Sequence, residues 1–128
     1  MRYALVNCDI YTGETILYDK AIVVNGEKIE ALVDMNKIPL ALDVVDLRGA
    51  NIAPGFIDLQ INGGGGLLFN DNPTEATLDV IYAAHKRFGT LNFLPTLITA
   101  DMNNMLQAIN TVNSCVRNNR YGVLGIHL

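Results

Sequence analysis

The stretch FIDLQIN, residues 56–62, decides the fold that the sequence predicts. Successive side chains of a strand point to opposite faces, so Asp58, Gln60 and Asn62 share one face and the apolar residues take the other. An open parallel sheet is usually apolar on both faces, whereas a barrel strand turns one face to an interior that opens at the active-site end. Three polar residues on one face therefore favour a parallel β/α barrel. The alternative is that Asp58 and Asn62 simply cap turns.

The sequence after residue 52 alternates between strand and helix patterns. A helix is expected to start at the tetrapeptide NPTE, residues 72–75, with Asn72 as its N-cap, and to end before Gly89. The other expected elements are a strand at about 92–97, a helix capped by Asp101 and a strand at about 123–128. The residues expected on the buried helix faces are Leu78, Ile81, Tyr82, Phe88, Met105, Ile109, Val112 and Val116. This β-α-β-α-β order predicts a parallel sheet with right-handed crossovers.

The first 52 residues have the period of short antiparallel strands. Residues 4–10 alternate between apolar and polar side chains, as in a half-buried strand. The dipeptide Asn25-Gly26 predicts a type I′ hairpin between strands at about 20–24 and 28–33, and a further strand is expected at about 44–47. We therefore expect an α/β chain. Residues 1–52 form part of a small β-sandwich, and residues 53–128 form the first three strands and two helices of a (β/α)₈ TIM barrel.

The composition narrows the class of protein. Charged residues make up 17% of the chain, below the roughly 25% of typical soluble domains, so apolar surface is expected to be covered by self-association, as in a homodimer. No apolar run approaches the roughly 20 residues of a membrane span, and the N-terminus lacks a secretory signal, which together predict a cytoplasmic protein. Cys8 and Cys115 are then expected to be reduced. The net charge of −4 argues against a nucleic-acid partner.

A run of four glycines, residues 63–66, follows the decisive stretch. No Gly-Lys-Ser/Thr follows the run, so it is not a phosphate-binding P-loop. Leu68 stands where a dinucleotide-binding fingerprint needs its third glycine. The run therefore serves either as a flexible turn or as a place where the backbone approaches a ligand closely.

Four stretches carry a resemblance to a known family. They are PGFIDLQING (54–63), FND (69–71), NFLPTLIT (92–99) and GIHL (125–128). In this order they resemble the amidohydrolase superfamily and, within it, the N-acetylglucosamine-6-phosphate deacetylase family. Most members of the superfamily carry His-x-His where this chain has Gln60 and Asn62. Gly64 stands where some members of the family have cysteine.

The resemblance implies a hydrolase that splits a sugar-phosphate substrate into glucosamine 6-phosphate and acetate. Because amide oxygens are weak zinc ligands, it also implies one divalent metal, zinc or else iron, manganese or cobalt. The family's metal-binding Glu and two His, and the Asp that acts as general acid and base, would all lie beyond Leu128. No metal ligand or catalytic residue is thus expected in this chain, and we expect the chain alone to bind no metal and to be inactive. Gln60, Asn62 and His127 are expected to line the active site.

Two other functions remain open at this stage. One is a different amidohydrolase, similar to dihydroorotase or hydantoinase, which the missing His-x-His disfavours. The other is a non-enzymatic module built from half a barrel. His85 falls within the first expected helix, so we expect it to lie on the helix surface or in packing rather than in the site.

Overall fold

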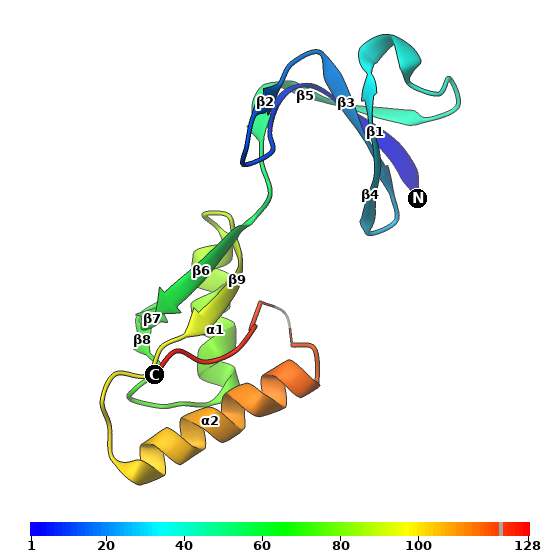
Figure 1. The fold of residues 1–128 in the computed structure, drawn as a ribbon. Helices are drawn as coiled ribbons and strands as arrows, with labels where there is room; N and C mark the ends of the chain where they lie inside the picture. The colour runs from blue at the N-terminus through cyan, green and yellow to red at the C-terminus, as the bar shows by residue number, and fades with distance from the viewer. Residues whose placement is uncertain (121) are drawn as a thin grey trace. The chain divides into compact units, whose positions relative to one another are not determined.

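The computed structural model describes residues 1–120 and 122–128 and divides into two compact units, Met1–Pro54 and Gly55–Leu128 (Figure 1). The first unit contains β1 (Arg2–Tyr11), β2 (Ile16–Leu17), β3 (Lys20–Asn25), β4 (Lys28–Asp34), a 3-10 turn (Met35–Lys37) and β5 (Asp43–Ile52). The second contains β6 (Phe56–Ile61), β7 (Gly63–Gly64), β8 (Leu67–Leu68), α1 (Glu75–Lys86), β9 (Thr90–Pro95) and α2 (Met102–Arg117). In the described part of the chain, no helix is long and apolar enough to cross a membrane.

The first unit is built on one five-stranded sheet with β1 at its centre. Strands β2 and β3 pair with β1 in antiparallel fashion, and β4 forms a hairpin with β3. Strand β5 pairs with β1 in parallel. The expectation of antiparallel strands only is therefore wrong for β5, because the chain crosses over between β4 and β5 instead of turning back in a hairpin. Strand β5 is also longer than the predicted range 44–47.

A β-bulge divides the core of this unit. Residues Ala4, Val6, Cys8 and Ile10 are all buried, as their alternation predicts. The backbone of Asn7 has a φ of 55°, and the register with β5 shifts at this point. As a result Ala4 and Val6 pack in one apolar cluster, whereas Cys8 and Ile10 pack in another that also contains Leu5. The bulge thus moves the apolar pattern from one face of the sheet to the other.

Asp46 on β5 holds the bulge in place. Its Oδ1 atom accepts hydrogen bonds from the Arg48 backbone N–H at 2.8 Å and from Asn7 Nδ2 at 2.9 Å. These two bonds favour the ionised carboxyl and lower the pKa of Asp46 below its ordinary value. The bulge therefore depends on a contact between residues 39 positions apart.

The predicted hairpin is present, but its turn starts one residue later than expected. Asn25 pairs with Lys28, so the two central residues are Gly26 and Glu27. Gly26 has a φ of 61°. A positive φ at the first central position is typical of type II′ turns with glycine at that place.

The β3–β4 hairpin carries an ion cluster that makes stability depend on pH. Lys20 and Lys37 both pair with Asp34, Lys37 at 2.8 Å, and the hydrogen bonds from the two ammonium groups lower the pKa of Asp34 to about 2. A carboxyl with a lowered folded-state pKa stabilises the fold above its unfolded pKa, and this stabilisation is lost as the pH falls.

Asp34→Asn should therefore lower the free energy of unfolding slightly at pH 7, with a deficit that disappears between about pH 4 and pH 2. Urea denaturation of wild type and variant at several pH values measures the deficit. Glu27→Gln, in the exposed hairpin turn, is the control and should change stability little at any pH. A deficit for Asp34→Asn that stays constant down to pH 2 would contradict the assignment.

The second unit begins with the predicted β-α-β-α order. Strands β6 and β9 pair in parallel. The expected third strand at 123–128 is not a continuous strand. It makes two isolated parallel bridges, one from Val123 to Phe93 in β9 and one from His127 to Thr96 directly after β9. The segment nevertheless runs parallel to β9 along its length.

The two helices begin with side-chain caps. Asp101 caps α2 as predicted, since its Oδ1 accepts from the backbone N–H groups of Asn103 and Asn104 at 2.9 and 3.0 Å. The cap of α1 is Thr74, whose Oγ1 accepts from the Thr77 N–H at 3.3 Å. The prediction of Asn72 as the cap is thus wrong by two residues.

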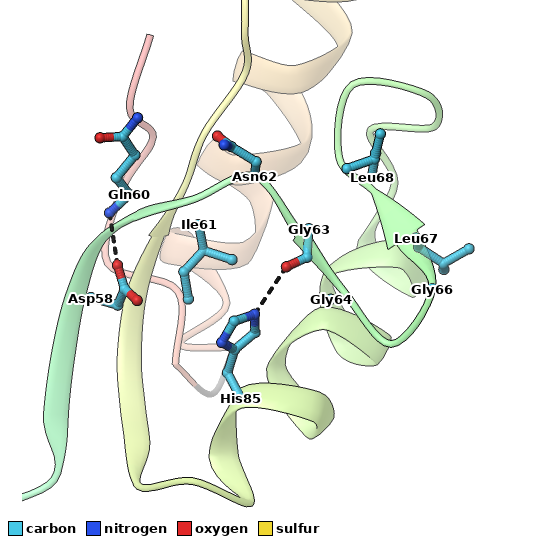
Figure 2. Close-up of a pocket in the computed structure, with 10 residues that line it drawn as sticks. All are labelled: Asp58, Gln60, Ile61, Asn62, Gly63, Gly64, Gly66, Leu67, Leu68 and His85. Atoms are coloured by element: carbon cyan, nitrogen blue, oxygen red, sulfur yellow. Dashed lines mark hydrogen bonds between the residues drawn. The ribbon is translucent and has the colours of Figure 1, made fainter.

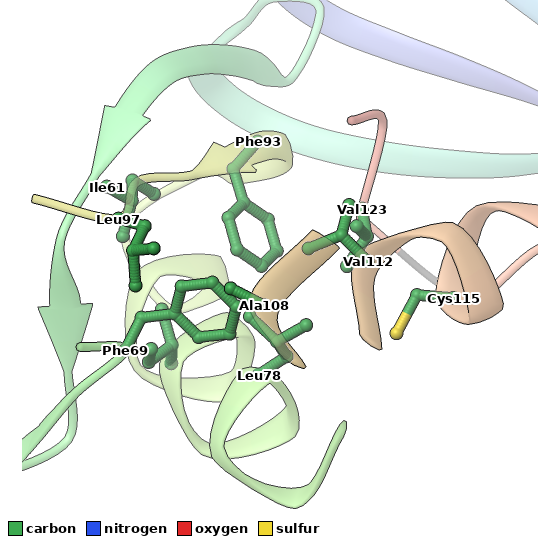
Figure 3. Close-up of a cluster of buried hydrophobic side chains, with 10 residues drawn as sticks. Ile61, Phe69, Leu78, Phe93, Leu97, Ala108, Val112, Cys115 and Val123 are labelled. Carbon is green, nitrogen blue, oxygen red and sulfur yellow. The ribbon is translucent and has the colours of Figure 1, made fainter. Parts of the chain in front are cut away.

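The core of this unit lies between the two helices and the strands (Figure 3). It contains Ile61, Phe69, Leu78, Ile81, Phe93, Leu97, Ala108, Val112, Cys115 and Val123. The buried face of α2 is rotated from the expected one, since Ala108 and Cys115 are buried while Val116 is exposed. Phe88 was expected in the core but lies beyond the end of α1 with 78% of its surface exposed. Cys8 and Cys115 are free thiols, and burial raises the pKa of both.

Candidate active site

Strand β6 presents the polar residues that define the candidate site. Gln60 is exposed and points away from helix α1 (Figure 2). Asn62, directly after the strand, is also exposed. Strand alternation puts Ile57, Leu59 and Ile61 on the opposite face, where they would contact the helices. Only Ile61 is buried, while Ile57 and Leu59 are 57% and 64% exposed. The two helices cover the end of β6 near Ile61 and leave its first half open.

Asp58 has a local structural role. Its Oδ1 accepts a hydrogen bond from the Gln60 backbone N–H at 3.0 Å. The register between β6 and β9 shifts between Asp58 and Ile61, so the Asp58 side chain satisfies a backbone donor where the ladder is irregular. This contact matches the alternative in which Asp58 caps a turn.

His127 reaches the same irregular part of β6. Its Nδ1 lies 2.9 Å from the carbonyl oxygen of Leu59. A carbonyl oxygen only accepts hydrogen bonds, so Nδ1 carries the proton. In a neutral His127 the Nε2 atom therefore keeps its lone pair and can accept a hydrogen bond.

A hollow of about 530 Å³ lies beside β6. Its polar wall is formed by Asp58, Gln60 and Asn62, and its other wall by the glycine loop and His85 of α1 (Figure 2). The structure thus brings Gln60 and Asn62 to one hollow. His127 contacts β6 but does not line this hollow.

The glycine run packs directly against helix α1. A Cβ atom on Gly64 would lie 2.9 Å from the His85 ring, and one on Gly65 would lie 2.7 Å from Val80. The His85 Nε2 atom also donates to the Gly63 carbonyl oxygen at 2.9 Å. Close approach of the loop to the helix therefore explains these glycines without a ligand. The place of His85 within a helix predicts a position outside the site, but its ring lines the hollow and its Nε2 is bonded to the Gly63 carbonyl oxygen of the glycine loop.

Gly63 has the least room of these glycines. A Cβ atom there would lie 2.2 Å from the Leu67 carbonyl oxygen, whereas one on Gly66 would meet nothing within 4 Å. Gly63→Ala should displace the β7–β8 turn and destabilise the fold by about 1–3 kcal/mol. Gly66, with a φ of 86°, is the matched control, because alanine there costs about 1–2 kcal/mol through backbone strain alone.

Urea denaturation measures both changes. A shift of the His85 ring resonances in Gly63→Ala, absent in Gly66→Ala, would report the displaced turn. Equal effects of the two substitutions on the His85 resonances would contradict the close-packing explanation.

Within residues 1–120 and 122–128, no group of three or more His, Cys, Asp or Glu side chains is placed to hold a metal ion. Gln60 and Asn62 offer only amide groups, which are weak ligands for zinc. These residues alone do not fit a catalytic metal.

Comparison with known proteins identifies the relatives of this chain. Residues 2–52 match the family model of the NagA composite domain. The whole chain is 39% identical over 128 residues to the N-acetylglucosamine-6-phosphate deacetylase of Haemophilus influenzae, covering 100% of this chain and 34% of that protein. The predicted resemblance to the N-acetylglucosamine-6-phosphate deacetylase family is therefore confirmed.

Other relatives agree on this family. The human N-acetylglucosamine-6-phosphate deacetylase is 33% identical over 101 residues, which cover 73% of this chain and 24% of that protein. The N-acetylgalactosamine-6-phosphate deacetylase of Shewanella sp. ANA-3 is 44% identical over 81 residues, covering 63% of this chain and 21% of that protein. The chain thus spans only about a third of the length of the Haemophilus influenzae deacetylase, which it matches over all 128 residues.

A solved structure supports the fold over nearly the whole chain. The N-acetylglucosamine-6-phosphate deacetylase of Pasteurella multocida matches with a TM-score of 0.91 and 38% identity, over 99% of this chain and 34% of that one. The deacetylase of Mycobacterium smegmatis, at 22% identity and a TM-score of 0.77 over 91% of this chain and 32% of that one, shares the fold.

Proposed function

We propose that this chain is the first part of a deacetylase that hydrolyses the acetamide of N-acetylglucosamine 6-phosphate to glucosamine 6-phosphate and acetate. The observation that carries the proposal is the 39% identity over all 128 residues to a deacetylase of that name. Because the chain spans only 34% of that relative, the activity belongs to a longer protein. We call this chain, continued over the remaining length of its relatives, the extended protein.

In this proposal β6, β9 and the segment 123–128 are the first three strands of a (β/α)₈ TIM barrel, and residues 1–52 are part of a small β-sandwich. The parallel pairing of β6 with β9 and the parallel bridges to residues 123 and 127 support the barrel. Exposed apolar side chains on β6, such as Ile57 and Leu59, would then be covered by further elements. We also propose a cytoplasmic homodimer, in keeping with the two free thiols.

The residues of this chain would bind and orient substrate rather than carry out the proton transfers. Gln60 and Asn62 can donate and accept hydrogen bonds at the end of β6, where a barrel opens to its active site. His127, whose Nδ1 is held by the Leu59 carbonyl, offers Nε2 as an acceptor for a substrate hydroxyl or a water. The general acid and base, an Asp, is proposed to follow residue 128 in the extended protein.

One divalent metal, zinc or else iron, manganese or cobalt, is part of the proposal. Its ligands, a Glu and two His, are also proposed to follow residue 128, because the described residues do not form a ligand set. A bound metal would activate water and polarise the acetamide carbonyl.

One observation favours a second candidate substrate. The 44% identity over 81 residues is to a protein named for N-acetylgalactosamine 6-phosphate. The two sugars differ only in the configuration at C4, so acetate release from each, measured side by side with the extended protein, decides between them. If the extended protein hydrolyses neither sugar phosphate, the proposed function is wrong.

Gln60→Ala tests the placement of the site. In the extended protein this substitution should lower kcat by about tenfold or more and change the unfolding midpoint little. For comparison, removing one donor that stabilises a transition state lowers kcat by about 10²–10³. Gln107→Ala, an exposed position on α2, is the matched control and should retain full activity. An active Gln60→Ala protein would remove Gln60 from the site.

A further inference from the structure

The side chain of Asn70 makes a pair of hydrogen bonds to the backbone of one residue, Ile98. Its Nδ2 donates to the Ile98 carbonyl oxygen at 2.7 Å, and its Oδ1 accepts from the Ile98 backbone N–H at 2.8 Å. The side chain is partly buried. A primary amide offers one donor and one acceptor side by side, so it matches the C=O and N–H of one residue, as a residue on a neighbouring antiparallel strand does.

A third bond fixes the backbone of the same residue. The Asn104 Nδ2, from the first turn of α2, donates to the Asn70 carbonyl oxygen at 2.9 Å. The loop between β8 and α1 is thereby tied both to the loop after β9 and to the start of α2.

These two loops are hydrogen-bonded to the segments that carry two of the candidate site residues, Asn62 and His127. The Phe69 N–H, directly before Asn70, donates to the Asn62 carbonyl oxygen at 2.9 Å. On the other side the Leu97 N–H, directly before Ile98, donates to the His127 carbonyl oxygen at 3.0 Å. A short series of hydrogen bonds therefore joins the backbone of Asn62 to that of His127 through the side chain of Asn70.

We infer that Asn70 is a positioning residue that holds the segments of Asn62 and His127 in register at the active-site end of the strands. The inference rests on the proposed function, because it assumes that these two residues face substrate. We call the two hydrogen bonds between the Asn70 side chain and the Ile98 backbone the Asn70 clamp. A displacement of about 1 Å in a site can cost about 10²-fold in rate, so loosening this clamp should lower kcat. The role requires a donor and an acceptor together, which distinguishes it from packing.

Two isosteric substitutions separate the clamp from packing. Asn70→Leu removes donor and acceptor at every pH. Asn70→Asp keeps an acceptor for the Ile98 N–H, but its second oxygen faces the Ile98 carbonyl oxygen and can donate only when protonated. The charged groups on the neighbouring stretches are Asp71 and Asp101, both carboxylates, so they too favour the protonated form of the new aspartate.

The expected results follow from this chemistry. In the extended protein, well below its melting temperature, both substitutions should lower kcat at pH 8 by about tenfold and speed amide hydrogen exchange of Ile98 by about tenfold. As the pH falls toward 5, the ratio of Asn70→Asp to wild type should rise for kcat and the exchange difference should shrink, while Asn70→Leu stays impaired. The same two changes at Asn110, exposed on α2, should leave both quantities unchanged.

The outcomes separate the two proposals. Wild-type kcat and Ile98 exchange in Asn70→Leu would overturn the positioning role, as would an Asn70→Asp deficit that does not narrow at lower pH. If the wild-type extended protein hydrolyses neither sugar phosphate, the proposed function fails. In that case a pH-dependent difference in Ile98 amide exchange between Asn70→Asp and wild type would still support the clamp. If that exchange difference were missing, the clamp would be overturned as well.

Discussion

Residues 1–128 alone should release no measurable acetate from N-acetylglucosamine 6-phosphate, while the extended protein should turn it over. Hydrolysis at a metal site needs about three protein ligands and a positioned acid and base. The described residues hold no cluster of three potential ligands. His85 belongs to no such cluster, and its Nε2 donates to the Gly63 carbonyl oxygen.

The size of this effect can be bounded. Loss of the general base alone costs a factor of about 10²–10⁴, and loss of the metal-activated water costs more. The measurement is acetate release by the purified chain with added zinc, beside the extended protein at equal concentration. Turnover by the chain within tenfold of the extended protein would overturn the placement of the catalytic groups beyond residue 128.

Sequence alone predicted the elements whose signals are local. Asp101 caps α2 because its carboxylate reaches N–H groups two and three residues away. The alternation of β1 predicted four buried residues correctly. Where two nearby residues could both act, the sequence did not decide. Asn72 and Thr74 are both good caps, and in the structure it is the Thr74 side chain that accepts from the Thr77 N–H.

Features that depend on distant partners could not be predicted. The bulge at Asn7 requires Asp46, and the pinning of the glycine loop requires His85, 22 residues from Gly63. For the candidate site, strand alternation predicted that Gln60 and Asn62 share one face, and both residues line the same hollow. It could not predict that the Leu59 carbonyl sets the tautomer of His127, because that contact joins residues 68 apart.

Phe93→Ala should cause one of the largest losses of stability of any single substitution in the second unit. Phe93 is fully buried and stacks on Tyr82 of α1 with ring centroids 6.1 Å apart and planes 10° apart. Truncating a buried phenylalanine to alanine costs about 3–5 kcal/mol, because apolar contacts are lost and a cavity remains. That loss is a large part of the roughly 5–15 kcal/mol that stabilises a typical domain.

Phe88→Ala is the matched control and tests where α1 ends. The helical period placed Phe88 on the buried face, but the helix ends at Lys86 and the ring is 78% exposed. Its truncation should change the free energy of unfolding by about 0.5 kcal/mol or less. Urea denaturation of both variants in the extended protein measures the contrast. If the two substitutions cost the same, then either Phe88 packs against elements that follow residue 128 or Phe93 does not hold the core between β9 and α1.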